Sequence, residues 1–400
     1  MKRDNFHNFL HPYLFSLILY FPILLIYLSI PHKVFEKWYG SPKLMSIDDV
    51  GIVLYFVLLI IGFSISAYVG EKIKLPIFRI RKTVPLWYIR LGLLISILAY
   101  IIWFLAAFKR AGSVESLISI YLVDPFFVKE NYMKTLPGIT TLTQVSVMAI
   151  PFMVCFYRLE IIDKILVIII VIFAMIRSFV YSERLALLEI IIPMGYVFLL
   201  KKNVTLKMFV KYFLVTLVGI IAFFVINEAF RSFRYKNVES IWMEGIIRLL
   251  GYFLTALNNS ILYISEYSFE MPTYHTFQMI WKFPLFDHLY YKVWKTIIPN
   301  TPVILYREGL NPEFNNINII GTMVSDWGFL GAFLIINTIG IISGIIYRLS
   351  SKSRFFLAIY SLWFVGLLEF MRISYFFDTR LFPAYLFLLG SLFLRMYKHN

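Results

Sequence analysis

Ten apolar runs, each long or nearly long enough to cross a lipid bilayer, constrain this chain more than any other feature of its sequence. A transmembrane helix needs about 20 mostly apolar residues to span a hydrocarbon core about 30 Å thick. The runs occupy residues 12–30, 50–69, 86–108, 138–157, 165–182, 185–200, 208–226, 328–347, 355–370 and 381–397. The sequence therefore predicts an all-α fold, a polytopic transmembrane helical bundle with about 10 spans.

The composition agrees with this prediction and excludes other classes of protein. Hydrophobic residues make up 60% of the 400 residues and charged residues only 15%, whereas a soluble domain has roughly 25% charged residues. A soluble enzyme and a disordered chain are both excluded, since disorder needs low hydrophobicity and high charge. The single cysteine, Cys155, excludes an intrachain disulfide. We expect one integral membrane domain over residues 1–400.

The positions of lysine and arginine predict the orientation of the spans, because cytoplasmic loops carry an excess of both residues. With the N- and C-termini in the cytoplasm, the inner loops become basic, and they contain Lys72, Lys74, Arg79, Arg81, Lys82, Lys201, Lys202, Lys207, Lys211, Arg348, Lys352 and Arg354. Topology thereby explains the formal net charge of +15, so we expect no nucleic acid as a partner. The sequence has no GxxxxGK[ST], CxxC or HExxH motif, and we expect no nucleotide, metal or other cofactor.

A large loop, residues 227–316, separates the seventh and eighth spans, and this orientation places it outside the cytoplasm. Residues 245–265 carry one polar stripe at helical spacing, formed by Arg248, Gly251, Thr255, Asn258 and Asn259. We expect an amphipathic helix in or near the membrane interface. The alternative is an extra span, in which Arg248 and the two asparagines would be costly in lipid.

The rest of this loop is rich in aromatic and amide side chains. The aromatic residues anchor a chain at the membrane interface or bind the apolar faces of sugars, and they include Tyr274, Trp281, Tyr290, Tyr291 and Trp294. The amides either bind hydroxyl groups or form turns, and they are Asn311, Asn315, Asn316 and Asn318.

Charged residues beside the spans are costly in lipid and indicate where function lies. Four groups fall on the outer face in this topology: Arg177, Glu183, Arg184 and Glu189; Glu228, Arg231 and Arg234; Glu369, Arg372, Asp378 and Arg380; and Asp326. One guanidinium group can bind two phosphate oxygens at once. The arginines therefore predict an anionic ligand. The alternative is that they pair with the neighbouring carboxylates or extend to lipid headgroups.

A pyrophosphate carries the negative charge that these arginines would bind. We assign the binding of a pyrophosphate, or of a glycan attached to it, to Arg184, Arg231, Arg234, Arg248, Arg372 and Arg380. A sugar hydroxyl attacking an anomeric carbon also needs a general base. The candidate bases are Glu228, Asp326 and His275, with His288 as a further histidine of the same loop.

Residues 320–348 (IGTMVSDWGFLGAFLIINTIGIISGIIYR) resemble a segment of the O-antigen polymerases, the Wzy-like oligosaccharide repeat-unit polymerases. The similarity lies in an acidic–aromatic–Gly–x–x–Gly start to a late span, here Asp326, Trp327, Gly328 and Gly331, followed by Gly340 and Gly344. Residues 181–187 (YSERLAL) are similar to a Ser-x-Arg turn of that family, and the long outer loop matches as well.

The resemblance implies a glycosyltransferase of the bacterial inner membrane that needs no cofactor. It would polymerise undecaprenyl-pyrophosphate-linked oligosaccharide repeat units into O-antigen or a similar surface polysaccharide, on the periplasmic face. It also implies a chain-length regulator and a flippase as partners, beside membrane lipid. Two alternatives stay open: a transferase that uses a polyprenyl-phosphate sugar, with Asp48 and Asp49 as its acidic pair, and a lipid-linked oligosaccharide flippase.

Overall fold

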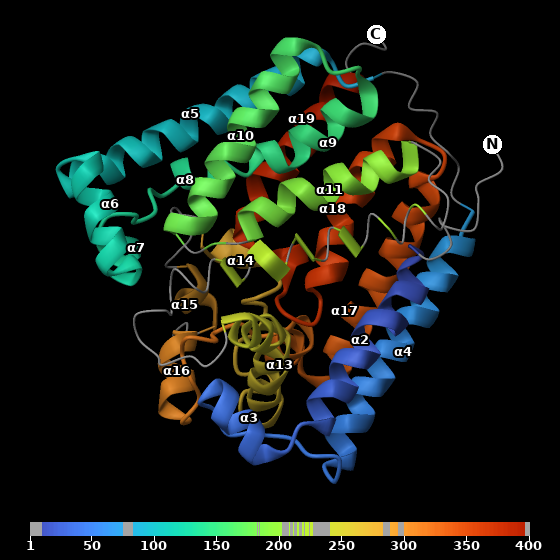
Figure 1. Cartoon of the computed structure of the whole chain (residues 1–400). Helices are drawn as coiled ribbons and strands as arrows, with labels where there is room; N and C mark the ends of the chain where they lie inside the picture. The colour runs from blue at the N-terminus through green and yellow to red at the C-terminus, as the bar shows by residue number, and fades with distance from the viewer. Residues whose placement is uncertain are drawn as a thin grey trace. The chain divides into compact units, whose positions relative to one another are not determined.

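The computed structural model describes residues 10–74, 83–181, 183, 185–201, 241–282, 289–294 and 300–396, with eleven positions between 208 and 226. Every regular element within these residues is helical, and they contain no strand (Figure 1). This confirms the all-helical prediction for the described part of the chain.

The helices follow one another closely along the chain, in this order: α2 (Pro12–Ser29), α3 (His32–Tyr39), α4 (Val50–Lys72), α5 (Leu86–Ala111), α6 (Val114–Val123), α7 (Pro125–Asn131), α8 (Ile139–Leu142), α9 (Val145–Phe156), α10 (Ile161–Val180), α11 (Leu185–Lys201), α13 (Ile241–Glu266), α14 (Gln278–Trp281), α15 (Leu289–Trp294), α16 (Thr301–Arg307), α17 (Ile319–Ser350), α18 (Arg354–Glu369) and α19 (Phe382–Met396). Two short 3₁₀ turns, Tyr375–Phe377 and Thr379–Leu381, separate α18 from α19.

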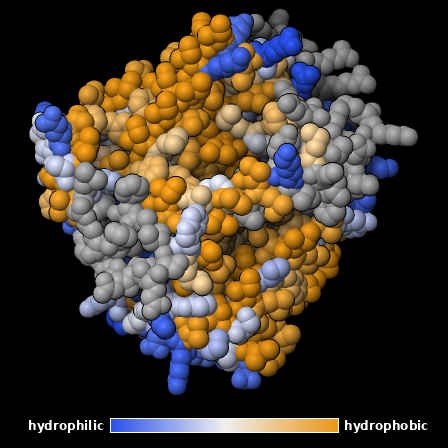
Figure 2. Space-filling view, in the orientation of Figure 1, coloured by the Kyte–Doolittle hydropathy of each residue, from blue (hydrophilic) through white to orange (hydrophobic). Residues whose placement is uncertain are grey.

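Six stretches of helix in the described residues are long and apolar enough to cross a membrane. They are α2, α4, α5, the α8–α9 pair, α13 and α17. The chain is therefore a helical membrane protein. Figure 2 agrees, because hydrophobic side chains cover much of the visible described surface. The predicted number of spans and their orientation stay predictions, and eight of the 19 positions at residues 208–226 lie outside the described part.

The predicted span at residues 138–157 is broken into two helices. Thr143 and Gln144 separate α8 from α9. The hydroxyl of Thr140 donates to the carbonyl oxygen of Leu136, and that of Thr143 donates to the carbonyl oxygen of Thr140. Such local bonds compete with the regular helical pattern, which explains why an apolar run of this length does not form one continuous helix.

The predicted span at residues 328–347 extends further at its N-terminal end. Helix α17 begins nine residues earlier, at Ile319, and is kinked at Gly328, where φ is +65°. Only glycine adopts this conformation without strain. The start of the helix is fixed by Asn318, whose side-chain oxygen accepts a hydrogen bond from the backbone N–H of Gly321 at 3.1 Å.

The polar stripe of α13 does not face water. The helix itself is as predicted, but Arg248, Thr255, Asn258 and Asn259 are all buried. Asn258 accepts from the Tyr27 hydroxyl at 2.6 Å, and Asn259 donates to the carbonyl oxygen of Phe314 at 2.6 Å. The stripe is buried because other segments of the chain satisfy its hydrogen bonds, which removes the cost of placing amides in an apolar environment.

The described chain divides into two compact units, each assembled from separate stretches of sequence. Unit 1 contains residues 1–75, 242–348 and 366–379, and unit 2 contains residues 76–241, 349–365 and 380–400. The single integral membrane domain expected over residues 1–400 stays a prediction.

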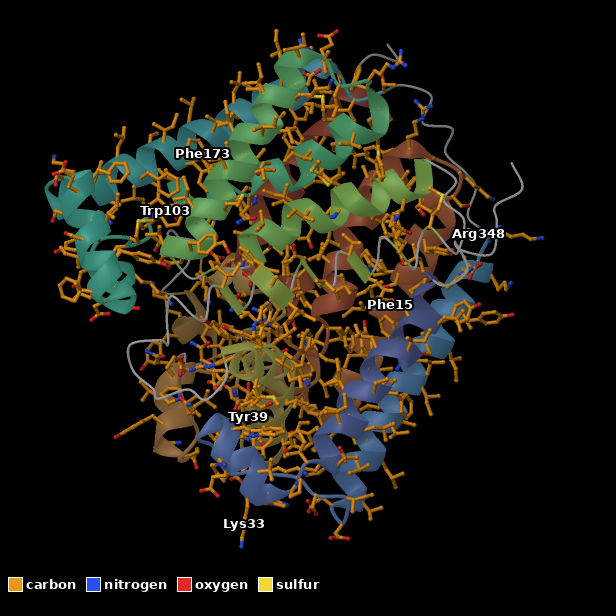
Figure 3. The ribbon with its side chains drawn as sticks, viewed as in Figure 1. Phe15, Lys33, Tyr39, Trp103, Phe173 and Arg348 are labelled. Carbon is orange, nitrogen blue, oxygen red and sulfur yellow. The ribbon has the colours of Figure 1, made fainter. Side chains whose placement is uncertain are left out.

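Within unit 1, the backbones of α4 and α17 approach each other closely. A Cβ added at Gly70 would overlap the Ile341 carbonyl oxygen, and one added at Gly344 would overlap that of Ala67. Small residues let two membrane helices approach this closely. We call this contact the α4–α17 seam. Arg348, labelled in Figure 3, lies at the end of this seam. It donates to the carbonyl oxygens of Glu71 and Lys72, the last two residues of α4, and to the carbonyl oxygen of Ile73 at 2.6 Å.

Candidate functional site

Asp326 is a fully buried carboxylate held by two successive residues of the loop before α14. Its Oδ1 accepts hydrogen bonds from the backbone N–H of His275 at 3.0 Å and from His275 Nδ1 at 2.8 Å. Its Oδ2 accepts from the backbone N–H of Thr276 at 2.6 Å and from the Thr276 hydroxyl at 2.8 Å. Four donors therefore satisfy the two oxygen atoms of this one carboxyl group. We call this arrangement the Asp326–His275 pair.

The loop reaches Asp326 because its backbone runs along the first turns of α17. The N–H groups of Phe269 and Met271 donate to the carbonyl oxygens of Val324 and Ser325, both at 3.1 Å. Phe269 and Thr273 have φ values of +59° and +61°. Non-glycine residues adopt this region rarely, so the contacts with α17 hold the loop in a conformation that it would not take by itself.

Two tryptophan side chains fix the same loop. Trp281 Nε1 donates to the carbonyl oxygen of Thr273 at 3.1 Å, and Trp327 Nε1 donates to the Thr276 hydroxyl at 2.7 Å. Thr276 is thus both a donor to Asp326 and an acceptor from Trp327. Partly buried indole groups commonly have such partners, and these two bonds hold the loop on either side of His275.

The hydrogen bond to Asp326 determines which nitrogen of His275 carries a proton. Nδ1 must donate to the carboxylate, so in the neutral ring Nε2 holds the lone pair. Nε2 makes no hydrogen bond within the described part of the chain, and the side chain is 11% exposed. A carboxylate that fixes the imidazole in this way produces the geometry of a general base.

Aromatic rings surround this histidine. The Tyr274 and Tyr263 rings lie 5.0 and 6.2 Å from the imidazole, centroid to centroid. Both tyrosines belong to a buried cluster with Leu262, Met271, Tyr290, Ile304, Leu305, Leu310 and Ile317. Burial raises the pKa of the Tyr274 hydroxyl to about 12. That phenol stays protonated at neutral pH, which leaves His275 as the base among these neighbours.

Two of the predicted anion-binding arginines lie in unit 1, and both are paired. Arg248 is buried between Glu313 at 2.8 Å and Glu244 at 3.6 Å, over the ring of Phe314. Arg372 pairs with Glu369 at 2.7 Å and lies over the ring of Tyr252. The alternative interpretation, pairing with carboxylates, describes both arginines in this structure. Their predicted role in binding a pyrophosphate or a glycan stays a prediction.

Arg380 belongs to a buried charge network in unit 2. It contacts Glu183 at 2.7 Å and Glu189 at 2.8 Å. Arg177 donates to the same Glu183 at 2.7 Å and to the Thr143 hydroxyl at 2.8 Å, and its guanidinium lies over the Trp103 ring. The network thus contains two arginines and two glutamates among the described residues. The break between α8 and α9 is what places Thr143 in this network.

The structure thus brings together two of the three predicted catalytic residues, Asp326 and His275. The third, Glu228, lies outside the described residues, as do Arg184, Arg231, Arg234 and His288. Thr276 and Trp327 complete the site and were not predicted, although each directly follows a predicted residue. The turn role is confirmed for Asn311, which accepts from the Glu313 backbone N–H, whereas Asn318 caps the start of α17.

Within the described ranges, no group of three or more His, Cys, Asp or Glu side chains is placed to hold a metal ion. Compared with protein-family models, curated proteins and solved structures, the chain matches none of them.

Proposed function

We propose that this chain is a membrane glycosyltransferase that polymerises undecaprenyl-pyrophosphate-linked oligosaccharide repeat units into O-antigen or a similar surface polysaccharide. The reaction would take place on the periplasmic face of a bacterial inner membrane. The observation that carries the proposal is the 2.8 Å contact between His275 Nδ1 and Asp326. It provides an oriented base in the loop that the sequence places outside the cytoplasm.

In the proposed reaction, an acceptor sugar hydroxyl attacks the anomeric carbon of the donor. The hydroxyl proton passes to His275 Nε2 while the new carbon–oxygen bond forms. The bond from the anomeric carbon to the pyrophosphate breaks, and undecaprenyl pyrophosphate leaves with the electron pair. Asp326 stabilises the imidazolium that results, because its charge lies against Nδ1.

The surroundings of His275 support a sugar as the acceptor. Trp281 packs against the buried aromatic cluster beside the imidazole, with its ring centroid 5.5 Å from that of Tyr290, and it is partly exposed, so its ring can meet a sugar. Aromatic faces match the apolar faces of sugar rings. Binding of the pyrophosphate by Arg248 or Arg372 requires the phosphate oxygens to replace their glutamate partners, since both guanidinium groups are paired.

The transferase with an acidic pair at Asp48 and Asp49 receives less support. The Asp49 carboxylate accepts from the backbone N–H of Ser46 at 2.6 Å and from the Ser46 hydroxyl at 3.1 Å. This is the geometry of a local turn at the start of α4. No contact in the described residues favours the flippase.

The variant His275→Asn tests the proposal. The asparagine amide nitrogen takes the place of Nδ1 and keeps a donor to Asp326, but the side chain has no base. We expect the glycan ladder on a gel to collapse to one repeat unit on its acceptor, with an unchanged level of protein in the membrane. The matched control is His32→Asn on α3, an exposed histidine, which keeps the full ladder. A full ladder from His275→Asn would refute the role of His275.

A further inference from the structure

Helices α6 and α7 form a short hairpin, residues 114–131, attached to the end of α5 (Figure 1). The Ser113 hydroxyl caps α6 by accepting from Ser116 N at 3.0 Å, and Asp124 caps α7 by accepting from Phe127 N at 2.9 Å. Arg110 donates to the carbonyl oxygens of Tyr132 and Lys134, which fastens the returning chain to α5. The hairpin therefore has a defined position on this helix.

One face of the hairpin packs inside unit 2. Leu117 and Val128 are buried against Trp103 and Phe104 of α5, and Trp103 is labelled in Figure 3. The hydroxyl of Tyr121 donates to the carbonyl oxygen of Phe179 at 3.0 Å. These contacts use the side of α6 that carries Leu117 and Tyr121.

Two exposed strips of α6 lie outside this packed side: an apolar strip directly beside it and a polar strip on the far side of the helix. Val114 and Ile118, four residues apart and on one strip, are 49% and 54% exposed. Glu115 and Ser119 follow them on the next strip and are also exposed. A helix with a packed side, an apolar strip and a polar strip matches the pattern of helices that lie in the membrane interface.

The attachment to α5 determines what meets the apolar strip. Helix α5 is long and apolar enough to cross a membrane, and Lys109 and Arg110 occupy its last turn. Basic residues at that position mark the level of the lipid headgroups. Gly112 and Ser113 separate α5 from α6, and two residues reach at most about 7 Å. The hairpin therefore starts at the bilayer surface.

We propose that the α6–α7 hairpin lies in the membrane interface, with Val114 and Ile118 in contact with the acyl chains. Residues 109–134 contain four basic and three acidic side chains, so the net charge is small. Contact with lipid therefore depends on apolar burial, and the hairpin contacts zwitterionic and anionic bilayers alike. This proposal does not depend on the reaction catalysed by the protein.

Single labels on adjacent residues test the proposal. Cys155 is the sole cysteine and is buried, so the variants Ile118→Cys and Ser119→Cys each provide one reactive thiol. Each is labelled with a fluorophore whose emission depends on polarity and is reconstituted in phosphatidylcholine vesicles. Lipids with a nitroxide near the headgroup report contact with the bilayer, and iodide reports contact with water. Unsubstituted protein provides the background signal.

We expect blue-shifted emission, strong quenching by the nitroxide lipid and loss of iodide quenching at position 118. At position 119 we expect red-shifted emission, weak quenching by the nitroxide lipid and strong quenching by iodide. Because the two labels are one residue apart, the orientation of the protein in the vesicles affects both equally. Equal iodide quenching at 118 and 119 would overturn the proposal. Shielding of 118 from both quenchers would also overturn it, because protein then covers the strip. The pair Val114→Cys and Glu115→Cys repeats the test if either first variant misfolds.

Discussion

Asp326 is fully buried, and its donors among the described residues are two backbone N–H groups, a hydroxyl and an imidazole. Two of its four hydrogen bonds come from backbone N–H groups, and two come from side chains. A buried charge is tolerated when each of its acceptor sites is satisfied. The carboxylate therefore orders the loop at residues 275–276 as well as orienting His275.

The variant Asp326→Asn should destabilise the protein by about 1–3 kcal/mol, because an amide turns an NH₂ group toward donors that need an acceptor. Thermal unfolding in detergent, followed by the reactivity of buried Cys155 with a thiol dye, measures the change. The control Asp48→Asn, at an exposed position, should stay within about 0.5 kcal/mol of the original protein. Equal stability of both variants would contradict the role given to the Asp326–His275 pair.

The arginine pairs should differ in their contribution to stability. Arg380→Ala removes a guanidinium group from Glu189, a fully buried carboxylate, which costs about 3–5 kcal/mol. Arg248→Ala should cost less, because water reaches Glu244 and Glu313, whose side chains are 23% and 37% exposed. Adding Glu189→Gln to Arg380→Ala should restore part of the loss in the same thiol assay. A larger loss from Arg248→Ala would contradict this order.

The sequence predicted individual site residues but not which of them are in contact. Asp326 and His275 stood out because charged and titratable groups near spans are costly. Their contact joins segments 51 residues apart, and a single sequence carries no signal for such a pairing. For the same reason, the pairing of Arg380 with Glu183 and Glu189 could be given only as an alternative to its predicted role in ligand binding.

At the scale of elements, the sequence predicted most helices well and their interruptions poorly. Helix α2 ends within one residue of the expected span, because its apolar run is long enough to stay one helix despite the internal Pro22. The division of residues 138–157 was missed because it arises from threonine side chains bonding to the backbone. The buried setting of α13 was missed because its amides bind loops that are distant in sequence.

The glycines of α17 serve different purposes. Gly328 supplies a backbone conformation at the kink, whereas Gly344 supplies space at the α4–α17 seam. Gly344→Ala should therefore destabilise the protein by about 1–3 kcal/mol through overpacking. Gly195→Ala on α11 is the control, because a methyl group there meets no atom within 4 Å. That variant should gain about 0.5–1 kcal/mol from helix propensity. Similar melting temperatures for the two variants would count against the seam.

At the scale of the whole molecule, the orientation of the chain is the central open prediction, and α13 decides it. If α13 lies outside the hydrocarbon core, Asp48 and Tyr306 are on the same side of the membrane. If α13 spans, they are on opposite sides. Both positions are exposed, so cysteines there are accessible to reagents.

We expect a membrane-impermeant maleimide to label Asp48→Cys and Tyr306→Cys in intact spheroplasts. Lys352→Cys, in a predicted cytoplasmic loop, should be labelled only after the membrane is opened. Buried Cys155 keeps the background low. Labelling of position 48 but not 306 would show that α13 crosses the membrane and would place the Asp326–His275 pair on a different side from the one proposed.

The α4–α17 seam also has a consequence for biosynthesis. About 250 residues separate the end of α4 from the start of α17, and a ribosome needs roughly 10–50 s to add them at ~5–20 residues per second. During this interval the strip of α4 that ends at Gly70 has no α17 to pack against. Lipid or an insertion factor must cover it until then. Helix α4 can pack against α2 at once, since Ser16 and Ser64 join these two helices, whereas its face toward α17 is covered only after the later half of the chain has been made.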